Sequence, residues 1–356
     1  MIKRKLGISN NNGYELDSNK IDEMLEELMR MKGYEYDVDT VAEELEKEIE
    51  IHEEQIKEYL TEIVKVSPLW LSKFIASNLQ GEQYEFVRKA ILLTAVSEDR
   101  MARGRIHTLL VGAPGCGKTE VLLWLKQHLG AYFVNAEYAS KVGLAGDARG
   151  VTITPGILAD ADGMILAIDE LDKMSWKDQS ALLQAMEEGA YTIVKGKHRA
   201  RFNARVRVVA AANDINKIQK PLLDRFDFVI TLNVPDREER AEHVDEIVRQ
   251  FFEGEEEIHA EVVRTLLRMV ADFIPAVENQ NAIANVMREY LKLTKLNVEE
   301  KSVRSLELSI LRIANALAKL SMSNVTPLKV VDAITLKDPT LTSTQVAYLR
   351  MVATKF

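Results

Sequence analysis

The spacing of apolar residues changes twice along the chain and divides it into three parts. Residues 15–65 place apolar side chains at helical intervals, which predicts a pair of helices. Ser67-Pro68 ends this region, because the residue before a proline avoids the helical conformation. Short apolar runs then alternate with helical segments up to Asp236, and helical spacing dominates the remainder. We therefore expect a helical N-terminal extension at 1–66, an α/β core at 67–236 and a helical C-terminal part at 237–356.

Five apolar runs in the central part predict the strands of a parallel sheet. Each run is predominantly apolar and lacks a regular alternation with polar residues, which is typical of strands covered by helices on both faces. The runs are His107–Val111, Tyr132–Val134, Met164–Ile168, Val206–Ala212 and Phe228–Leu232. The predicted fold class is therefore α/β, with helices flanking the sheet and an all-helical segment after it.

The composition narrows the class of protein. A hydrophobic content of 47% with 28% charged residues is typical of a soluble globular protein. We find no run of eighteen or more apolar residues, so we expect no membrane span. A single cysteine, Cys116, excludes an internal disulfide and a cysteine-rich zinc site. A reducing cytoplasm, or association with the nucleoid, is the expected location.

Charge is distributed unevenly along the chain. The net charge is −9, yet residues 15–65 alone hold 18 acids and 6 bases, so the rest of the chain is slightly basic. The stretch YTIVKGKHRARFNARVR, at 191–207, contains six lysines and arginines and no acid. Tyr191–Val194 and Arg199–Asn203 can pair across Lys195–His198, which predicts a hairpin with a charged tip. The acidic segment is interpreted either as a docking element for a protein partner or as a solvated helical pair.

The strongest local motif is GAPGCGKTE, at residues 112–120, which fits the phosphate-loop pattern G-x-x-x-x-G-K-[ST]. It follows an apolar run and precedes a helical stretch, so that backbone N–H groups and a helix N-terminus would face a phosphate. We expect Lys118 to reach the β- and γ-phosphates of ATP and Thr119 to ligate Mg²⁺. The predicted nucleotide-binding residues are Gly112, Ala113, Pro114, Gly115, Cys116, Gly117, Lys118, Thr119 and Glu120.

An acidic pair at the end of the third apolar run is the expected partner of this loop. Asp169 would join Thr119 in the shell of the metal ion, and Glu170 would face the attacking water. A strand followed by a helix-capping acid is the alternative interpretation. Cys116 is interpreted either as a small residue that fits the loop or as a site of redox control.

Taken together, these motifs resemble those of the AAA+ ATPases and, among them, the minichromosome maintenance (MCM) helicases. The matching stretches are GAPGCGKTE, LADADGMILAIDELDKM, QAMEEGAYTIVKGK, FNARVRVVAAAND and PLLDRFD, in this order, with a weaker match at SVRSLELSILRIANALAKL. The resemblance covers roughly residues 69–340. It implies an AAA+ P-loop core followed by an all-α lid, with ATP and Mg²⁺ as cofactors.

The resemblance also implies roles for particular residues. Asp169 would organise Mg²⁺, Glu170 would polarise the water, and Asn213 would orient that water as the first sensor. Arg225, in PLLDRFD, resembles the arginine finger that serves the neighbouring subunit, which implies a ring, most simply a hexamer. A surface salt bridge is the alternative role for Arg225. Arg304 resembles the second sensor arginine of the lid.

In this family the hairpin before the first sensor projects into the central channel, and its essential lysine corresponds to Lys195. The implied partner is single-stranded or forked DNA, bound through phosphates without base specificity. The implied DNA-binding residues are Lys195, Lys197, Arg199 and Arg201. A solvated hairpin whose lysines protect a sheet edge is the alternative.

The sequence departs from the family pattern in several places. Gly117 and Thr119 follow the general AAA+ form of the phosphate loop, and the helix-2 insert is shortened to about GDARGVTIT. We expect a minimal form without the family's usual N-terminal DNA-binding domain. The leading hypothesis is an ATP-driven helicase motor on single-stranded DNA. The alternatives are a protein-remodelling AAA+ chaperone of the MoxR kind and an ATP-switched loader or adaptor bound to DNA.

Overall fold

The structure is a computed structural model that divides into two compact units, Met1–Trp70 and Leu71–Phe356. It describes residue 60 and residues 63–355, with gaps at 61–62, 80, 98–103, 139–140, 148–152, 196–197, 243, 245–247, 249–256 and 297–305. The described end of the first unit is helical at 63–66. Nearly all of the predicted acidic helices at 15–65 lie outside the described residues, so the prediction of a docking element there stays a prediction.

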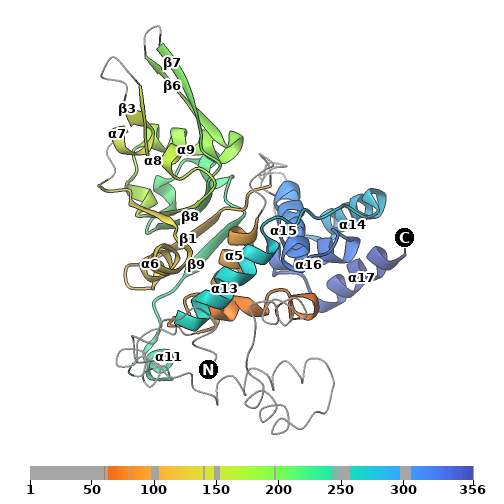
Figure 1. Ribbon diagram of the computed structural model, residues 1–356. Coiled ribbons are helices and arrows are strands. Elements are labelled where there is room, and N and C mark those ends of the chain that lie inside the picture. Colours follow the sequence, from red (N-terminus) through yellow and green to blue (C-terminus); the bar gives the residue numbers. More distant parts are fainter. Residues whose placement is uncertain are drawn as a thin grey trace, which may run out of the picture. The chain divides into compact units, whose positions relative to one another are not determined.

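The second unit is built on a five-stranded parallel sheet in the order β2-β5-β8-β1-β9 (Figure 1). Each strand coincides with one of the five predicted apolar runs to within one residue at either end, so the predicted sheet is confirmed. The strands are β1 Thr108–Gly112, β2 Tyr132–Asn135, β5 Ile165–Asp169, β8 Arg207–Ala212 and β9 Phe228–Leu232.

Helices cover both faces of this sheet. Helices α5 (Glu82–Val96) and α6 (Lys118–Leu129) pack on one face. Helix α9 (Trp176–Glu188) buries Leu182 and Met186 in the same apolar cluster as alternate residues of β1, β5 and β8, and so covers the other face. Ser175 caps α9 by accepting a hydrogen bond from the Asp178 N–H, and Gly189 ends it in the left-handed conformation. Both boundaries agree with the sequence pattern.

The predicted basic hairpin is present as a separate two-stranded ribbon. Strands β6 (Ala190–Lys195) and β7 (His198–Asn203) pair in antiparallel register, with Val194 opposite Arg199 and Lys195 opposite His198. Figure 1 shows this ribbon extending away from the five-stranded sheet. The Tyr191 and Phe202 rings, 5.6 Å apart, pack one face of its base onto the core.

A second, much shorter hairpin lies beside the base of the first. It consists of β3 (Gly146–Asp147) and β4 (Thr154–Pro155) and occupies the predicted position of the shortened helix-2 insert. The N–H of Gly156 donates a hydrogen bond to the Tyr191 hydroxyl (3.3 Å), which ties the two hairpins together at their bases. Short helices α7 (Lys141–Leu144) and α8 (Ile157–Asp160) flank this insert.

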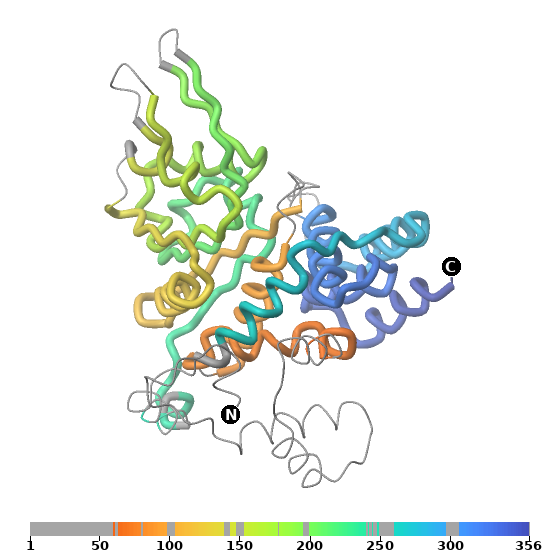
Figure 2. The backbone as a smooth tube through the Cα atoms, viewed as in Figure 1, coloured from red at the N-terminus to blue at the C-terminus, as the bar shows by residue number. Residues whose placement is uncertain are grey.

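The part of the chain after β9 is helical, as its apolar spacing predicts. Figure 2 shows its last four helices gathered together, and each of them packs against at least one other. Helix α13 packs across α5 and α6, and α15 contacts α5, which connects this part to the core. Its helices are α11 Arg237–Glu242, α13 Glu257–Val270, α14 Gln280–Leu293, α15 Glu307–Leu320, α16 Pro327–Lys337 and α17 Ser343–Thr354. Among the described residues, no helix combines the length and apolar character that crossing a bilayer requires.

Candidate functional site

The phosphate loop joins the end of β1 to the start of α6, as predicted. Gly117 lies directly before α6 with φ of +71°, and a side chain there would meet the Tyr84 hydroxyl at 2.9 Å. Gly115 also has a positive φ, of +85°, but a Cβ at this position would have no neighbour within 4 Å. The loop is therefore closed on the side of Tyr84 and open beside Gly115, which fits a cradle for a phosphate group.

The side chains that follow the loop connect it to the acidic strand. Lys118 is 6% exposed, and its Nζ donates hydrogen bonds to the carbonyl oxygens of Gly112 (2.7 Å) and Ala113 (2.9 Å). The Thr119 hydroxyl donates a hydrogen bond to Oδ2 of Asp169 (2.9 Å). Because a hydroxyl and a carboxylate are both ligands that Mg²⁺ accepts, this pair fits the predicted metal position beside the phosphate loop.

Glu170 has an unusual backbone conformation. Its φ of 55° and ψ of 41° lie in the left-handed region, which costs a non-glycine residue about 1–2 kcal/mol. Its carboxylate atom Oε2 is buried and has no hydrogen-bond partner among the described residues. A strained backbone that holds an unsatisfied carboxylate beside Asp169 favours a catalytic role for Glu170 over a helix-capping role.

Asn213 lies at the same edge of the sheet as these residues. It directly follows β8, whose neighbours are β5, which ends at Asp169, and β1, which leads into the phosphate loop. The Asn213 N–H donates a hydrogen bond to Oδ1 of Asp172 (3.0 Å), and the Asn213 side chain is exposed. The structure therefore brings the predicted first sensor to the carboxyl edge that also carries Lys118 and Asp169.

Arg225 lies at the opposite edge of the sheet. Two residues after it, the Asp227 N–H donates to the carbonyl oxygen of His107, directly before β1, whereas the phosphate loop follows β1. A strand of this length separates its two ends by roughly 15 Å. Within its own chain Arg225 pairs with Glu187 of α9, with 2.6 Å between Nη2 and Oε1. Arg304, the predicted second sensor, lies outside the described residues.

Three residues near the site were not predicted from the sequence. The Tyr84 hydroxyl donates to the carbonyl oxygen of Cys116 (3.0 Å), and burial raises the pKa of Tyr84, so the hydroxyl keeps its proton. Asp172 holds the Asn213 backbone, and Glu187 holds Arg225. Asp172 stands inside the IDELDKM stretch and Glu187 inside QAMEEGAYTIVKGK, which could have pointed to them, whereas Tyr84 carries no such signal.

The hairpin concentrates part of its charge on one face of the ribbon. Arg199 and Arg201 are both exposed and lie two residues apart on β7, so their side chains share a face. Arg201 also lies 3.3 Å from Glu188 in an exposed pair. Lys195 ends β6 and pairs in register with His198, while Lys197 lies outside the described residues.

Two further arginines of the basic stretch have internal partners. Arg205 forms a two-pronged contact with Asp162, with 2.8 Å between Nη2 and Oδ2. Arg207 donates hydrogen bonds to the carbonyl oxygens of Ala95 (2.6 Å) and Gly163 (2.8 Å). These two arginines therefore fasten the hairpin and β8 to the rest of the unit, and the other described basic residues of the stretch, Lys195, Arg199 and Arg201, lie on the hairpin itself.

Comparison with known proteins identifies the family in which this combination of loop, acidic strand and hairpin occurs. The family model described as the MCM P-loop domain matches residues 52–251, more than half of the chain. The chain belongs to the MCM family. The match begins earlier than the resemblance at 69–340 predicted and ends before the last helices. Within it lie Lys118, Asp169, Asn213 and the basic hairpin.

Individual relatives of this MCM chain are DNA replication licensing factors. The chain is 28% identical over 306 residues to mcm6 of Schizosaccharomyces pombe, which covers 75% of the chain and 34% of that protein. It is 32% identical over 210 residues to the maternal mcm3 of Xenopus laevis, and 27% identical over 330 residues to MCM4 of Arabidopsis thaliana. The chain spans between 25% and 38% of the length of these three relatives.

Proposed function

We propose that this MCM chain is an ATP-hydrolysing motor that moves on single-stranded DNA and separates the strands of forked DNA. The observation that carries the proposal is the contact between Thr119 and Asp169, which joins the phosphate loop to the acidic strand. The proposed first sensor, Asn213, directly follows the neighbouring strand β8, and only three residues separate β8 from the basic hairpin. Nucleotide chemistry and DNA contact would thus be linked through one strand.

The residues at the carboxyl edge of the sheet divide the chemistry among them. ATP supplies the anhydride whose hydrolysis provides the free energy, and Mg²⁺ neutralises charge on its phosphates. Lys118 and Thr119 would bind and orient the phosphate groups, and the Thr119 hydroxyl and the Asp169 carboxylate would hold the metal ion. Glu170 accepts the proton of the attacking water at its unsatisfied carboxylate, and Asn213 orients that water.

The position of Arg225 supports hydrolysis at an interface between subunits. Because it lies at the amino edge of the sheet, it is roughly a strand length from the phosphate loop of its own chain. A second copy placed head to tail would bring that edge next to the loop of its neighbour, and repeated addition closes into a ring. We therefore propose a homo-oligomeric ring, most simply a hexamer, in which Arg225 completes the neighbouring site.

The hairpin would contact DNA through phosphates. Arg199 and Arg201 are aligned on one exposed face, and Lys195 is the last residue of β6, two positions before Lys197 in the sequence. Contacts of this kind do not depend on base sequence and weaken steeply with salt. The expected property is sequence-tolerant binding that is lost as the salt concentration rises.

The test is an ATPase and strand-separation assay on the purified chain with forked DNA. Lys118→Ala and Glu170→Gln should abolish DNA-stimulated ATP hydrolysis, because they remove the phosphate contact and the base. Lys195→Ala should keep basal hydrolysis and lose unwinding. Normal unwinding by Lys195→Ala would show that the hairpin does not drive translocation.

Two other outcomes would replace the proposal. If the chain shows no affinity for single-stranded DNA even at low salt, the MoxR-like chaperone function becomes the better explanation. If it binds DNA and turns over ATP without separating strands, it acts as an ATP-switched loader or adaptor. A filter-binding titration across salt concentrations, run before the unwinding assay, distinguishes the first outcome from the second.

A further inference from the structure

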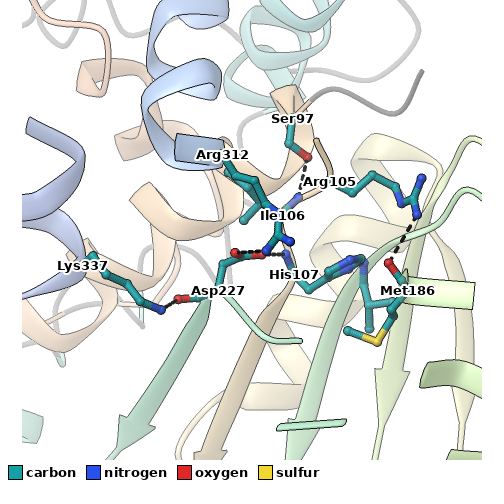
Figure 3. Close-up of polar contacts among 9 residues, drawn as sticks. Ser97, Arg105, Ile106, His107, Met186, Asp227, Arg312 and Lys337 are labelled. Atoms are coloured by element: carbon teal, nitrogen blue, oxygen red, sulfur yellow. Dashed lines mark hydrogen bonds and ion pairs between the residues drawn. The ribbon is translucent and has the colours of Figure 1, made fainter. Parts of the chain in front are cut away.

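A buried aspartate joins the sheet to the helices that follow β9, which are called the lid below. Asp227 is 1% exposed, and its Oδ2 accepts a hydrogen bond from the His107 N–H (3.0 Å) directly before β1. Its Oδ1 accepts a hydrogen bond from Nη1 of Arg312 on α15 (2.7 Å), and its carbonyl oxygen accepts one from Nζ of Lys337, the last residue of α16. Figure 3 shows these donors converging on Asp227 from three separate elements.

The pair between Asp227 and Arg312 differs from the other ion pairs of the lid in its burial. Arg312 is 12% exposed as a side chain, whereas Arg350 and Asp332, which pair within the lid at 2.7 Å, are 54% and 43% exposed. An exposed pair is screened by water and salt, but a buried pair resists separation because each partner would leave an unpaired charge in the interior. The Asp227–Arg312 contact is therefore a firm connection between the core and α15.

Arg225 lies only two residues before this connection, on a segment with little freedom to move. The N–H groups of Arg225 and Phe226 donate to carbonyl oxygens of the preceding turn, at 3.0 Å and 3.1 Å, and the Asp227 N–H donates to His107 at 2.8 Å. Phe226 is 3% exposed and packs in the core. A displacement of Asp227 is therefore passed to Arg225 and not absorbed between them.

We propose that Asp227 is a positioning residue for Arg225. By bonding to Arg312 and Lys337, it makes the segment that carries Arg225 move together with α15 and α16 of the same chain. The lid of one subunit then sets the position of the arginine that this subunit presents to its neighbour. The inference rests on the proposed role of Arg225 at the neighbouring site, and it adds that α15 and α16 control the position of Arg225.

The experiment compares the full chain with Asp227→Asn, Arg312→Gln and the control Arg350→Gln, which removes an exposed pair inside the lid. ATP affinity is measured with a fluorescent ATP analogue, and turnover is measured at saturating ATP with single-stranded DNA. Asp227→Asn and Arg312→Gln should lower kcat by about tenfold to a hundredfold, the range expected when a catalytic group is displaced by about an ångström. Their ATP affinity should stay close to that of the wild type, because the phosphate loop lies at the other edge. Arg350→Gln should leave both quantities unchanged.

The same substitutions are then placed in an Arg225→Ala background. If Asp227 acts through Arg225, Asp227→Asn and Arg312→Gln cause no further loss of kcat there. An unchanged kcat in the wild-type background, or the same fold-loss with and without Arg225, overturns the inference. If Arg225→Ala alone leaves kcat unaltered, the proposed function of Arg225 is what fails.

Arg312→Lys is the second variant, in case Asp227→Asn does not fold. It keeps a positive charge near Asp227 but loses the guanidinium geometry that reaches Oδ1. A reduction of kcat that disappears in the Arg225→Ala background supports the inference. Wild-type kcat for a folded Arg312→Lys protein whose thermal stability is lowered would overturn it, because the contact would then serve stability alone.

Discussion

Arg225 and Glu187 form one ion pair, and replacing each partner in turn separates a structural role of Arg225 from a catalytic one. The pair has 2.6 Å between Nη2 and Oε1, with side-chain exposures of 17% and 29%. A partly buried, charge-assisted hydrogen bond of this kind contributes about 1–2 kcal/mol to stability, between the values for surface pairs and for buried ones. Arg225→Ala and Glu187→Gln should therefore lower the free energy of unfolding by similar amounts in urea titrations.

Turnover should distinguish the two variants sharply. An arginine finger contributes roughly 10³–10⁵ to the rate of phosphoryl transfer, so Arg225→Ala should lower kcat by about 10³ or more. Glu187→Gln keeps the guanidinium of Arg225 and should change kcat by less than about threefold. The contact that it removes, between Arg225 and Glu187, is not one that Arg225 would make with the transition state at the neighbouring site. The assay is steady-state ATP hydrolysis with single-stranded DNA at saturating ATP. Equal losses of turnover in both variants would refute the reasoning and leave Arg225 as a structural partner of Glu187.

Three further predictions concern the core. Thr119→Val removes the hydrogen bond to Asp169 and should weaken nucleotide binding in the presence of Mg²⁺ much more than in its absence, as titrations with and without the metal would show. A Cβ at Gly112 would overlap the main-chain carbonyl oxygen of Leu232, so Gly112→Ala should cost about 1–3 kcal/mol of stability in urea unfolding. Burial, with Arg105 and Arg312 nearby, holds the pKa of His107 well below its usual value. Because the unfolded chain then binds the proton more readily, stability should fall by about 1.4 kcal/mol per pH unit below about pH 6.5, a slope that His107→Asn removes.

The sequence predicts the sheet well because the central strands β1, β5 and β8 are buried on both faces and therefore consist mostly of apolar residues. Each of the five predominantly apolar runs became a strand. The phosphate loop, Asp169, Glu170 and Asn213 were predicted to act together, and parallel topology is the reason: carboxyl ends of neighbouring strands meet at one edge. The order of the strands itself came only from the structure.

Side-chain partners across long separations could not be predicted. The sequence shows six lysines and arginines in the basic stretch, but only the structure shows that Arg205 pairs with Asp162 and that Arg207 donates to the carbonyl oxygens of Ala95 and Gly163. Likewise, PLLDRFD suggests a role for Arg225, whereas the contact of Asp227 with Arg312 joins residues 85 positions apart. Charge and residue type are local properties, but which acceptor a long side chain reaches is decided by the packing of distant helices.

The connection between the hairpin and Asn213, the proposed first sensor, bears on how this protein would respond to mechanical force. Only three residues separate β7 from β8, two of them are fully buried, and the third, Arg205, is fastened to Asp162. This three-residue link therefore has little freedom to extend, and β8 leads directly from it to Asn213 at the carboxyl edge of the sheet. A force on a DNA strand bound by the hairpin would therefore be transmitted along β8 to Asn213 and would distort the proposed site of ATP hydrolysis. If the protein is the proposed motor, an opposing load in a single-molecule experiment should slow ATP turnover and stepping together, so that it stalls without hydrolysing ATP.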